Sequence, residues 1–327
     1  MSVRRICGQW AMAACVAGLG VLATAPAVAE EVKSVAVTAI VEHPSLDAVR
    51  DGVKQALTDA GYIEGQNLKW QFQSAQGNTA TAAQIARQYV GSGADVLVGI
   101  ATPSAQALVA VTKSVPVVYS AVTDPVKAQL VPGFEASGTN VTGASDELEL
   151  SRQIELIKRV VPNATRVGMV YNPGEVNSVV VVERLKELLP AAGMTLVEAA
   201  APRTVDVGSA ARSLIGKVDL IYTNTDNNVV SAYEALVKVG SEAKLPLVAS
   251  DTDSVERGAV AAYGIDYYDL GVQTGRLVVR ILKGEAPGSI PSERSETVRL
   301  FVNPGAAAKQ GVTLSADLLA EAAKVIE

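Results

Sequence analysis

Three polar turns in the first part of the chain each follow an apolar stretch and contain residues that start helices. They are His43-Pro44-Ser45, Thr102-Pro103-Ser104 and Thr123-Asp124-Pro125. Residues 96–100, before the second turn, are too few for a helix and predict a buried strand. In the helix that follows, Thr102 is the expected cap and Pro103 the expected first helical residue. The free N–H groups of such a helix N-terminus can hold a carboxylate. An ordinary strand-to-helix turn has the same pattern, so one such turn alone does not indicate a ligand site.

The second part of the chain repeats this arrangement. Polar turns occur at residues 172–178, 226–228 and 251–253. Ligands of open parallel sheets lie beyond the carboxyl ends of the strands, so we expect the six turns to converge on one site.

The residue types in these turns suit the two ends of a small zwitterion. Hydroxyl and amide groups at helix starts suit a carboxylate, and these are Thr102, Ser104, Asn177 and Ser178. Three aspartates are candidate acceptors for an ammonium group, namely Asp124, Asp226 and Asp251. The alternative for each aspartate is a helix cap or an Asx-turn, and for His43 a solvated loop position.

The same residues are poorly suited to catalysis. The sequence has no Gly-x-Ser-x-Gly motif, and neither a Walker loop nor a Gly-x-Gly-x-x-Gly motif follows a predicted strand. His43 is the single histidine, and the pair Asp251 and Asp253 is weak support for a calcium site. We therefore expect no enzymatic activity, no cofactor and no metal.

The first 29 residues have the features of a cleavable signal peptide. Arg4 and Arg5 precede an apolar run at 11–23 and the small residues 27–29. A lipoprotein signal around Cys15 and a twin-arginine signal are the alternatives. Both cysteines, Cys7 and Cys15, lie in this segment, so the expected mature chain has no thiol for disulfides or catalysis.

The charge and length of the predicted mature chain of 298 residues indicate its class of partner and its number of domains. Without Arg4 and Arg5, the chain has 26 basic and 34 acidic residues, which gives a net charge of −8. This charge argues against nucleic acid as a partner. The length suffices for two domains, each with its own core.

Short β-branched stretches alternate with amphipathic helical stretches, and the order occurs twice. Predicted strands begin at 34, 68, 95 and 115, and again at 166, 195, 219 and 245, so each offset lies between 124 and 132 residues. The expected helices between them are 47–60, 79–90 and 104–112, then 179–189, 205–216 and 229–243. A strand at 259–265, a helix at 269–282, a strand at 297–302 and a helix at 316–326 complete the prediction.

This repeat predicts an α/β protein with two doubly wound, Rossmann-like lobes. We expect the N-terminal lobe to comprise residues 30–143 and 265–296, and the C-terminal lobe residues 144–264 and 297–327. The chain would cross between the lobes within 133–145, near 264 and near 297. Three such crossings would form a hinge.

A series of motifs resembles the substrate-binding proteins of ABC transporters, in the tryptophan/tyrosine-binding (TrpX-like) group. The resemblance covers residues 35–312 and rests on these motifs: His43-Pro44-x-Leu46-Asp47, Gly61-Tyr62-x-Glu64-Gly65-x-Asn67, Ala75-Gln76-Gly77-Asn78, Ala101-Thr102-Pro103-Ser104-Ala105-Gln106, Val122-Thr123-Asp124-Pro125-Val126, Asn140-Val141-Thr142-Gly143, Tyr171-Asn172-Pro173-Gly174-Glu175-x-Asn177-Ser178, Asp226-Asn227 and Gly264-Ile265-Asp266-Tyr267-Tyr268-Asp269-Leu270-Gly271.

The resemblance implies a type I periplasmic-binding-protein fold, with three hinge strands and a ligand between the lobes. It implies an amino-acid-like ligand, aromatic or apolar, delivered by a monomeric periplasmic protein to an ABC permease with its ATPase. The site residues that it implies are His43, Ser45, Leu46, Thr102, Ser104, Ala105, Thr123, Asp124, Asn172, Glu175, Asn177, Ser178, Asp226, Asn227, Asp251 and Asp266. A periplasmic sensor for a membrane receptor and an exported enzyme are the alternative functions.

Overall fold

The computed structural model describes residue 1 and residues 32–327. The predicted signal peptide, residues 1–29, lies outside the described residues except for residue 1. Within the described part, no helix combines the length and apolar character needed to cross a membrane.

Lobe one is built on a six-stranded sheet in the order β11-β5-β4-β3-β1-β2, in which neighbouring strands are parallel. Its strands are β1 (Lys33–Ala39), β2 (Leu68–Ser74), β3 (Val96–Ile100), β4 (Val117–Ser120), β5 (Val141–Ser145) and β11 (Glu293–Arg294). The helices α1 (Pro44–Asp59), α2 (Thr79–Gly91), α3 (Thr102–Val111) and α10 (Tyr267–Leu282) pack on this sheet, and a short 3-10 helix, η3, spans Pro287–Ser289.

Lobe two is built on a seven-stranded sheet in the order β13-β12-β10-β9-β8-β6-β7. Its strands are β6 (Arg166–Tyr171), β7 (Thr195–Ala200), β8 (Leu220–Thr223), β9 (Leu247–Asp251), β10 (Ala261–Ile265), β12 (Val298–Val302) and β13 (Lys324–Val325). Its helices are α4 (Leu150–Val160), α5 (Val176–Leu188), α6 (Val207–Ser213), α7 (Asn227–Ser231), α8 (Tyr233–Ala243), α9 (Asp253–Glu256), α11 (Pro304–Lys309) and α12 (Ala316–Glu321), with 3-10 helices η1 (Leu189–Ala192) and η2 (Thr204–Asp206). Two apolar clusters form its core.

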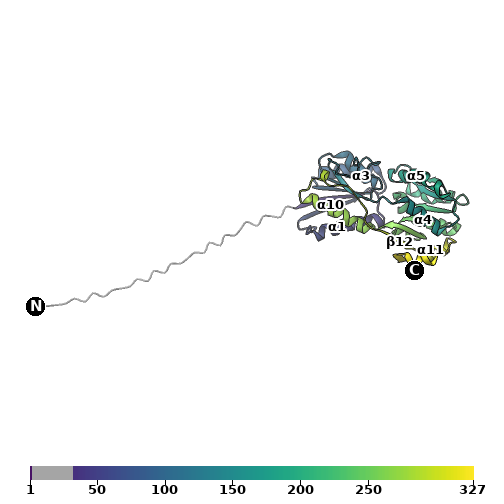
Figure 1. The fold of residues 1–327 in the computed structure, drawn as a ribbon. Helices are drawn as coiled ribbons and strands as arrows, with labels where there is room; N and C mark the ends of the chain where they lie inside the picture. The colour runs from purple at the N-terminus through teal and green to yellow at the C-terminus, as the bar shows by residue number, and fades with distance from the viewer. Residues whose placement is uncertain (2–31) are drawn as a thin grey trace. The chain divides into compact units, whose positions relative to one another are not determined.

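The chain passes between the two sheets three times. It leaves the first sheet after β5, returns after β10 to form α10, and crosses again between β11 and β12. Figure 1 shows the result, with the green helix α10 lying beside the purple helix α1 although α10 follows the strands of lobe two. The three connections lie side by side in the fold, because β11 pairs with β5 and β12 pairs with β10.

The alternation of strands and helices agrees with the sequence prediction, but several boundaries were wrong. The predicted helix 316–326 ends at Glu321, and residues 324–325 instead form β13 beside β12. The predicted helix 229–243 is two helices that meet at Ala232. The segment 133–145, expected only as a crossing, ends in strand β5. The strand was missed because Gly143 weakens the strand pattern of this segment. Only glycine fits at this position, since a Cβ there would lie 2.2 Å from the Tyr119 carbonyl oxygen.

Gly271 allows α10 to pack closely on α1. A Cβ at Gly271 would lie 2.2 Å from the Val49 carbonyl oxygen, whereas a Cβ at Gly91 in α2 would meet open space. We expect Gly271→Ala to lower the free energy of unfolding by about 1–3 kcal/mol, because the helices must separate. Gly91→Ala is the control and should change it by less than about 1 kcal/mol, in the stabilising direction. Urea unfolding of both variants checks this, and equal stabilities would contradict it.

Candidate functional site

A cavity lies where the polar turns of the two lobes meet. It encloses about 340 Å³ of empty space, counting the part open to solvent. Eight of the sixteen predicted site residues line it: His43, Ser45, Leu46, Thr102, Thr123, Asn177, Asn227 and Asp251. Six further residues complete the lining: Ala101, Ala121, Asp146, Thr225, Val230 and Tyr267.

The N-terminus of α3 forms one wall of this cavity. The sequence predicted Thr102 as the helix cap, but the structure has Ala101 at that position, with a φ of 69°, so Thr102 is the first helical residue. Thr102 and Ser104 are buried, and neither hydroxyl has a hydrogen-bond partner. A buried hydroxyl without a partner is costly, and a positive φ at alanine is strained. Such features are typical of a surface shaped for a ligand.

Close packing of α3 on the sheet sets the position of this wall. A Cβ at Gly99 in β3 would lie 2.7 Å from the Ala105 Cα atom, so glycine lets the helix start directly over the strand. Ala105 and Ser104 therefore support the wall, and neither lines the cavity. Ala121, after β4, also lines the cavity and also has a positive φ, of 54°.

His43 occupies the cap position of α1 and contributes an uncharged ring. It is 8% exposed, and its Nδ1 atom has no hydrogen-bond partner. Burial, with a smaller effect of the Arg257 charge, lowers the pKa of His43 to about 3. The ring is therefore neutral at physiological pH, and it can donate one hydrogen bond and accept another.

Two buried carboxylates give the cavity its negative charge. Asp146 Oδ1 accepts from the Thr123 hydroxyl at 3.0 Å, and Asp146 Oδ2 accepts from the Tyr267 hydroxyl at 2.9 Å. Asp251 accepts from the backbone N–H and hydroxyl of Ser254, at 2.8 and 2.7 Å. Burial raises the pKa of both groups, that of Asp251 to about 6. Among the described residues, no Lys or Arg lines the cavity, so a cationic group of a ligand would find two acceptors there.

Lobe two presents a carbonyl oxygen at the opposite wall. The Asn177 amide nitrogen donates to Glu175 Oε2 at 3.0 Å and to the Thr225 carbonyl at 3.1 Å. These bonds fix the amide, and its buried Oδ1 atom has no partner. Asn227 also donates to Glu175, from its backbone N–H at 3.2 Å. Glu175 therefore holds both asparagines from behind the wall and does not line the cavity.

Glu175 makes the stability of the protein depend on pH. Burial, and then the charge of Asp226, raises the pKa of Glu175 from 4.5 to about 7. Between these values the folded protein holds a proton that the unfolded chain has released, so stability from this group falls as pH rises from 4.5 to 7. We expect Glu175→Gln to flatten that decline in urea unfolding measured between pH 5 and 7.5.

The exposed carboxylate Glu242 provides the control for this measurement. Its side chain is 67% exposed and lies 4.0 Å from Lys238. Glu242→Gln should leave the pH dependence as it is in the native protein. Parallel curves for the native protein and Glu175→Gln would contradict the assignment to Glu175.

The remaining predicted residues lie outside the cavity lining and contact other parts of the protein. Asp226 caps α7, accepting from the Val229 N–H at 3.0 Å, and its other oxygen accepts from the Asn172 N–H and the Ser178 hydroxyl, each at 2.6 Å. Asp266 caps α10 and lies 3.4 Å from Arg299. The contacts of Asp226 fit the alternative that was open for it, a helix cap. Asn172 lines an outer cleft, described below.

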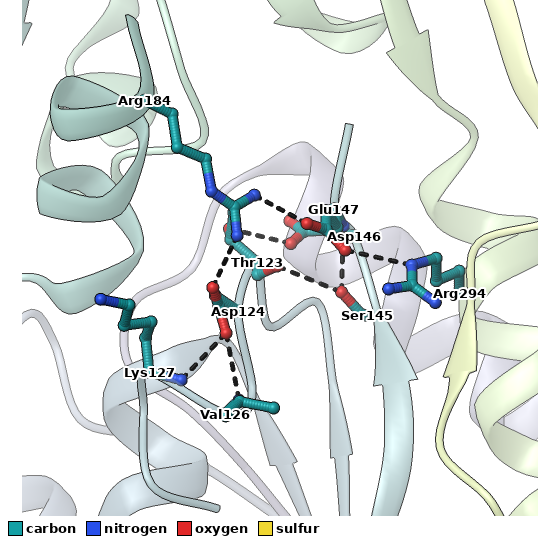
Figure 2. A network of polar contacts seen from close by, with 9 residues as sticks. All are labelled: Thr123, Asp124, Val126, Lys127, Ser145, Asp146, Glu147, Arg184 and Arg294. Atoms are coloured by element: carbon teal, nitrogen blue, oxygen red, sulfur yellow. Dashed lines mark hydrogen bonds and ion pairs between the residues drawn. The ribbon is translucent and has the colours of Figure 1, made fainter. Parts of the chain in front are cut away.

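Asp124 contributes to a contact between the lobes. Figure 2 shows Arg184, from α5 of lobe two, reaching Asp124 of lobe one and Glu147 of the first connection, each at 2.7 Å. Arg294, from strand β11 of lobe one, binds the other oxygen of Glu147 at 3.0 Å. The Thr123 and Thr225 hydroxyls also meet across the lobes at 3.3 Å. The two lobes are therefore held together beside the cavity.

Two of the lining residues that the sequence did not indicate, Asp146 and Tyr267, lie at connections between the lobes. Asp146 follows β5, which was not recognised as a strand, and no helix starts directly after it. Tyr267 begins α10 at the second connection. A signal was available for Tyr267, since it belongs to one of the quoted motifs. For Asp146 the only signal was its place directly after the predicted crossing 133–145.

An outer cleft borders the cavity. Both share Asn227, and the cleft is lined from lobe one by residues such as Pro103 and Gln106, and from lobe two by residues such as Asn172 and Glu175. Its empty space is about 1310 Å³, counting the part open to solvent.

Comparisons with known proteins agree with this architecture. Residues 34–326 match the family described as ABC transporter substrate binding protein. A tyrosine-binding protein of Clostridioides difficile is 40% identical over 271 residues, which are 83% of this chain and 79% of that protein. Proteins of this family bind solutes and are not enzymes.

Two solved structures resemble this one to different degrees. A Streptococcus pneumonia protein in complex with L-Trp is 37% identical, with a TM-score of 0.87, 90% of this chain covered and 100% of that chain. A ligand-free, open substrate-binding protein of Clostridium difficile is 38% identical, with a TM-score of 0.69, 90% of this chain covered and 99% of that chain. The described conformation is thus nearer to the ligand-bound structure. The fold is the type I periplasmic-binding-protein fold, and the chain belongs to the family of ABC transporter substrate-binding proteins.

Proposed function

We propose that this protein binds an aromatic amino acid in the cavity between its lobes and delivers it to an ABC importer. The observation that carries the proposal is that one cavity brings together two kinds of polar group. The α3 N-terminus, the Thr102 hydroxyl and the neutral His43 ring line it, and so do the carboxylates of Asp146 and Asp251, without a Lys or Arg among the described lining residues. A zwitterion complements both kinds of group. The tyrosine- and tryptophan-binding relatives support the aromatic side chain.

In this proposal the ligand shifts the equilibrium between open and closed lobes. The lobes are residues 30–143 with 265–296 and residues 144–264 with 297–327, and they move about the three connections. The closed state gains contacts from both lobes to the ligand, and this difference in contacts drives closure. A permease with its ATPase would then receive a monomeric binding protein in the periplasm, after removal of residues 1–29.

Ligand screening of the purified mature protein tests the proposal. Melting temperatures would be recorded with each of the twenty amino acids, and calorimetric titration would follow for those that raise them. Tryptophan or tyrosine should raise the melting temperature more than any aliphatic or charged amino acid does. A protein stabilised by none of the aromatic amino acids would contradict the proposed ligand class.

A further inference from the structure

A second cavity, which we call the inner cavity, lies directly behind the first. It is lined by Thr123, Asp146, Glu147, Leu148, Leu150, Val181, Arg184, Tyr222, Asn224, Thr225 and Ser250, with about 320 Å³ of empty space including the solvent-open part. Thr123, Asp146 and Thr225 line both cavities. The two spaces are therefore neighbours that share these three lining residues.

Two of the shared lining residues come from different lobes, so separation of the lobes would part them. The Thr123 and Thr225 hydroxyls, 3.3 Å apart, come from lobe one and lobe two respectively. Arg184, which also lines the inner cavity, binds Asp124 of lobe one, as Figure 2 shows. A group of a ligand could enter the inner cavity while the lobes are apart and would be enclosed when they close.

Asn224 presents an unpaired acceptor in the wall of the inner cavity. It is 1% exposed, and its Oδ1 atom has no hydrogen-bond partner. Its amide nitrogen donates to the Ser178 oxygen at 3.1 Å, and the Ser178 proton goes to Asp226 at 2.6 Å. The Ser178 oxygen can therefore only accept from Asn224, which fixes the amide and leaves Oδ1 as an acceptor. A buried acceptor of this kind is costly unless a donor reaches it.

Part of the wall of the inner cavity is apolar and suits an aromatic ring. Leu150, Val181 and Tyr222 are each 7% exposed or less and belong to a core cluster of lobe two. The rest of the lining is polar, and the Ser250 hydroxyl is a second buried group without a hydrogen-bond partner, besides Asn224 Oδ1. Apolar walls with a few placed polar groups are typical of sites that select a ligand by shape and hydrogen bonding.

We propose that the inner cavity receives the side chain of the bound amino acid and that Asn224 Oδ1 accepts a hydrogen bond from its tip. This inference rests on the proposed function and defines its specificity. Tryptophan supplies an indole N–H and tyrosine a phenol O–H, whereas phenylalanine has no donor and leaves Oδ1 unpaired. The site therefore discriminates against phenylalanine, because an unpaired buried acceptor weakens binding by about tenfold or more.

Calorimetric titration of native protein and Asn224→Leu with the three aromatic amino acids tests this inference. The native protein should bind tryptophan or tyrosine at least about tenfold more tightly than phenylalanine. Asn224→Leu should reduce that ratio to about one while it retains phenylalanine binding. Asn228→Leu is the matched control, since Asn228 is also a buried amide but lines the outer cleft, and it should keep the native ratio.

A ligand analogue tests the same contact without any mutation, in case Asn224→Leu does not fold. In β-(3-benzothienyl)alanine a sulfur atom replaces the indole N–H of tryptophan, so shape is kept and the donor is lost. The native protein should bind it about tenfold more weakly than tryptophan. Equal affinities, or an unchanged ratio in Asn224→Leu, would overturn the inference and leave the proposed function intact. Binding of no aromatic amino acid at all would instead overturn the proposed function.

Discussion

Asp146→Asn is expected to weaken binding of the amino-acid ligand by about 2–5 kcal/mol, because the ammonium group would lose its buried counter-charge. Asp146 is 3% exposed and lines both the cavity and the inner cavity. Its two hydrogen bonds come from neutral hydroxyls, those of Thr123 and Tyr267, and these do not compensate a negative charge. A carboxylate held in this way is suited to a cationic partner that arrives from outside.

Asparagine is the appropriate substitution, because it keeps the shape of the side chain. Its oxygen can still accept from Thr123, and the Tyr267 oxygen can accept from its amide, so the connection between β5 and α10 should survive. The free energy of unfolding without ligand should therefore change little or increase, because a buried charge is removed. Calorimetric titration measures the affinity, and urea unfolding shows that the fold is kept.

A control and a contrasting variant make this result specific. Asp95 precedes β3 at the end of the strand opposite the cavity, so Asp95→Asn should leave the affinity unchanged. Asp226→Asn gives the contrast, because Asp226 was a candidate for the ammonium site from sequence. Loss of affinity in Asp226→Asn, with none in Asp146→Asn, would place the ammonium against Asp226 and contradict the assignment to Asp146.

Sequence reasoning predicted the architecture well because the signal repeats. Eight predicted strands, four in each half and in the same order, define two mainly parallel sheets, and an error at one boundary does not change the topology. The missed strand β5 shows the limit of this approach. Gly143 weakens the strand pattern there, yet the structure needs glycine because Tyr119 packs against that backbone. Tertiary packing overrode local propensity at this position.

The candidate site was only partly predictable, for a different reason. The pattern of a polar turn after a strand finds side chains such as Thr102 and Asn227, but it does not distinguish those that face a cavity from those that face the protein. Asp226 and Asp251 occupy equivalent turns, and only Asp251 lines the cavity. That difference depends on the hydrogen bonds that Asn172 and Ser178 donate to Asp226, which arise from the packing of α5 against the turn.

Thr102→Val is expected to weaken ligand binding and to stabilise the protein without ligand. The Thr102 hydroxyl is buried at the start of α3 and has no partner within the protein. In the complex it would donate to the ligand carboxylate, and loss of a hydrogen bond to a charged group costs about 1.5–3 kcal/mol. Without ligand, the same hydroxyl is an unsatisfied buried group, so valine of nearly equal shape should raise the free energy of unfolding by about 1 kcal/mol.

Thr38 offers a control that separates these two effects. Its hydroxyl is also fully buried and also without a partner, but it lies in β1 and does not line the cavity. Thr38→Val should therefore raise the free energy of unfolding by a similar amount and leave the affinity unchanged. Urea unfolding and calorimetric titration of both variants give the four values needed. If Thr102→Val and Thr38→Val had the same affinity for the ligand, the Thr102 hydroxyl would be an unpaired core group and the α3 N-terminus would not be the carboxylate site.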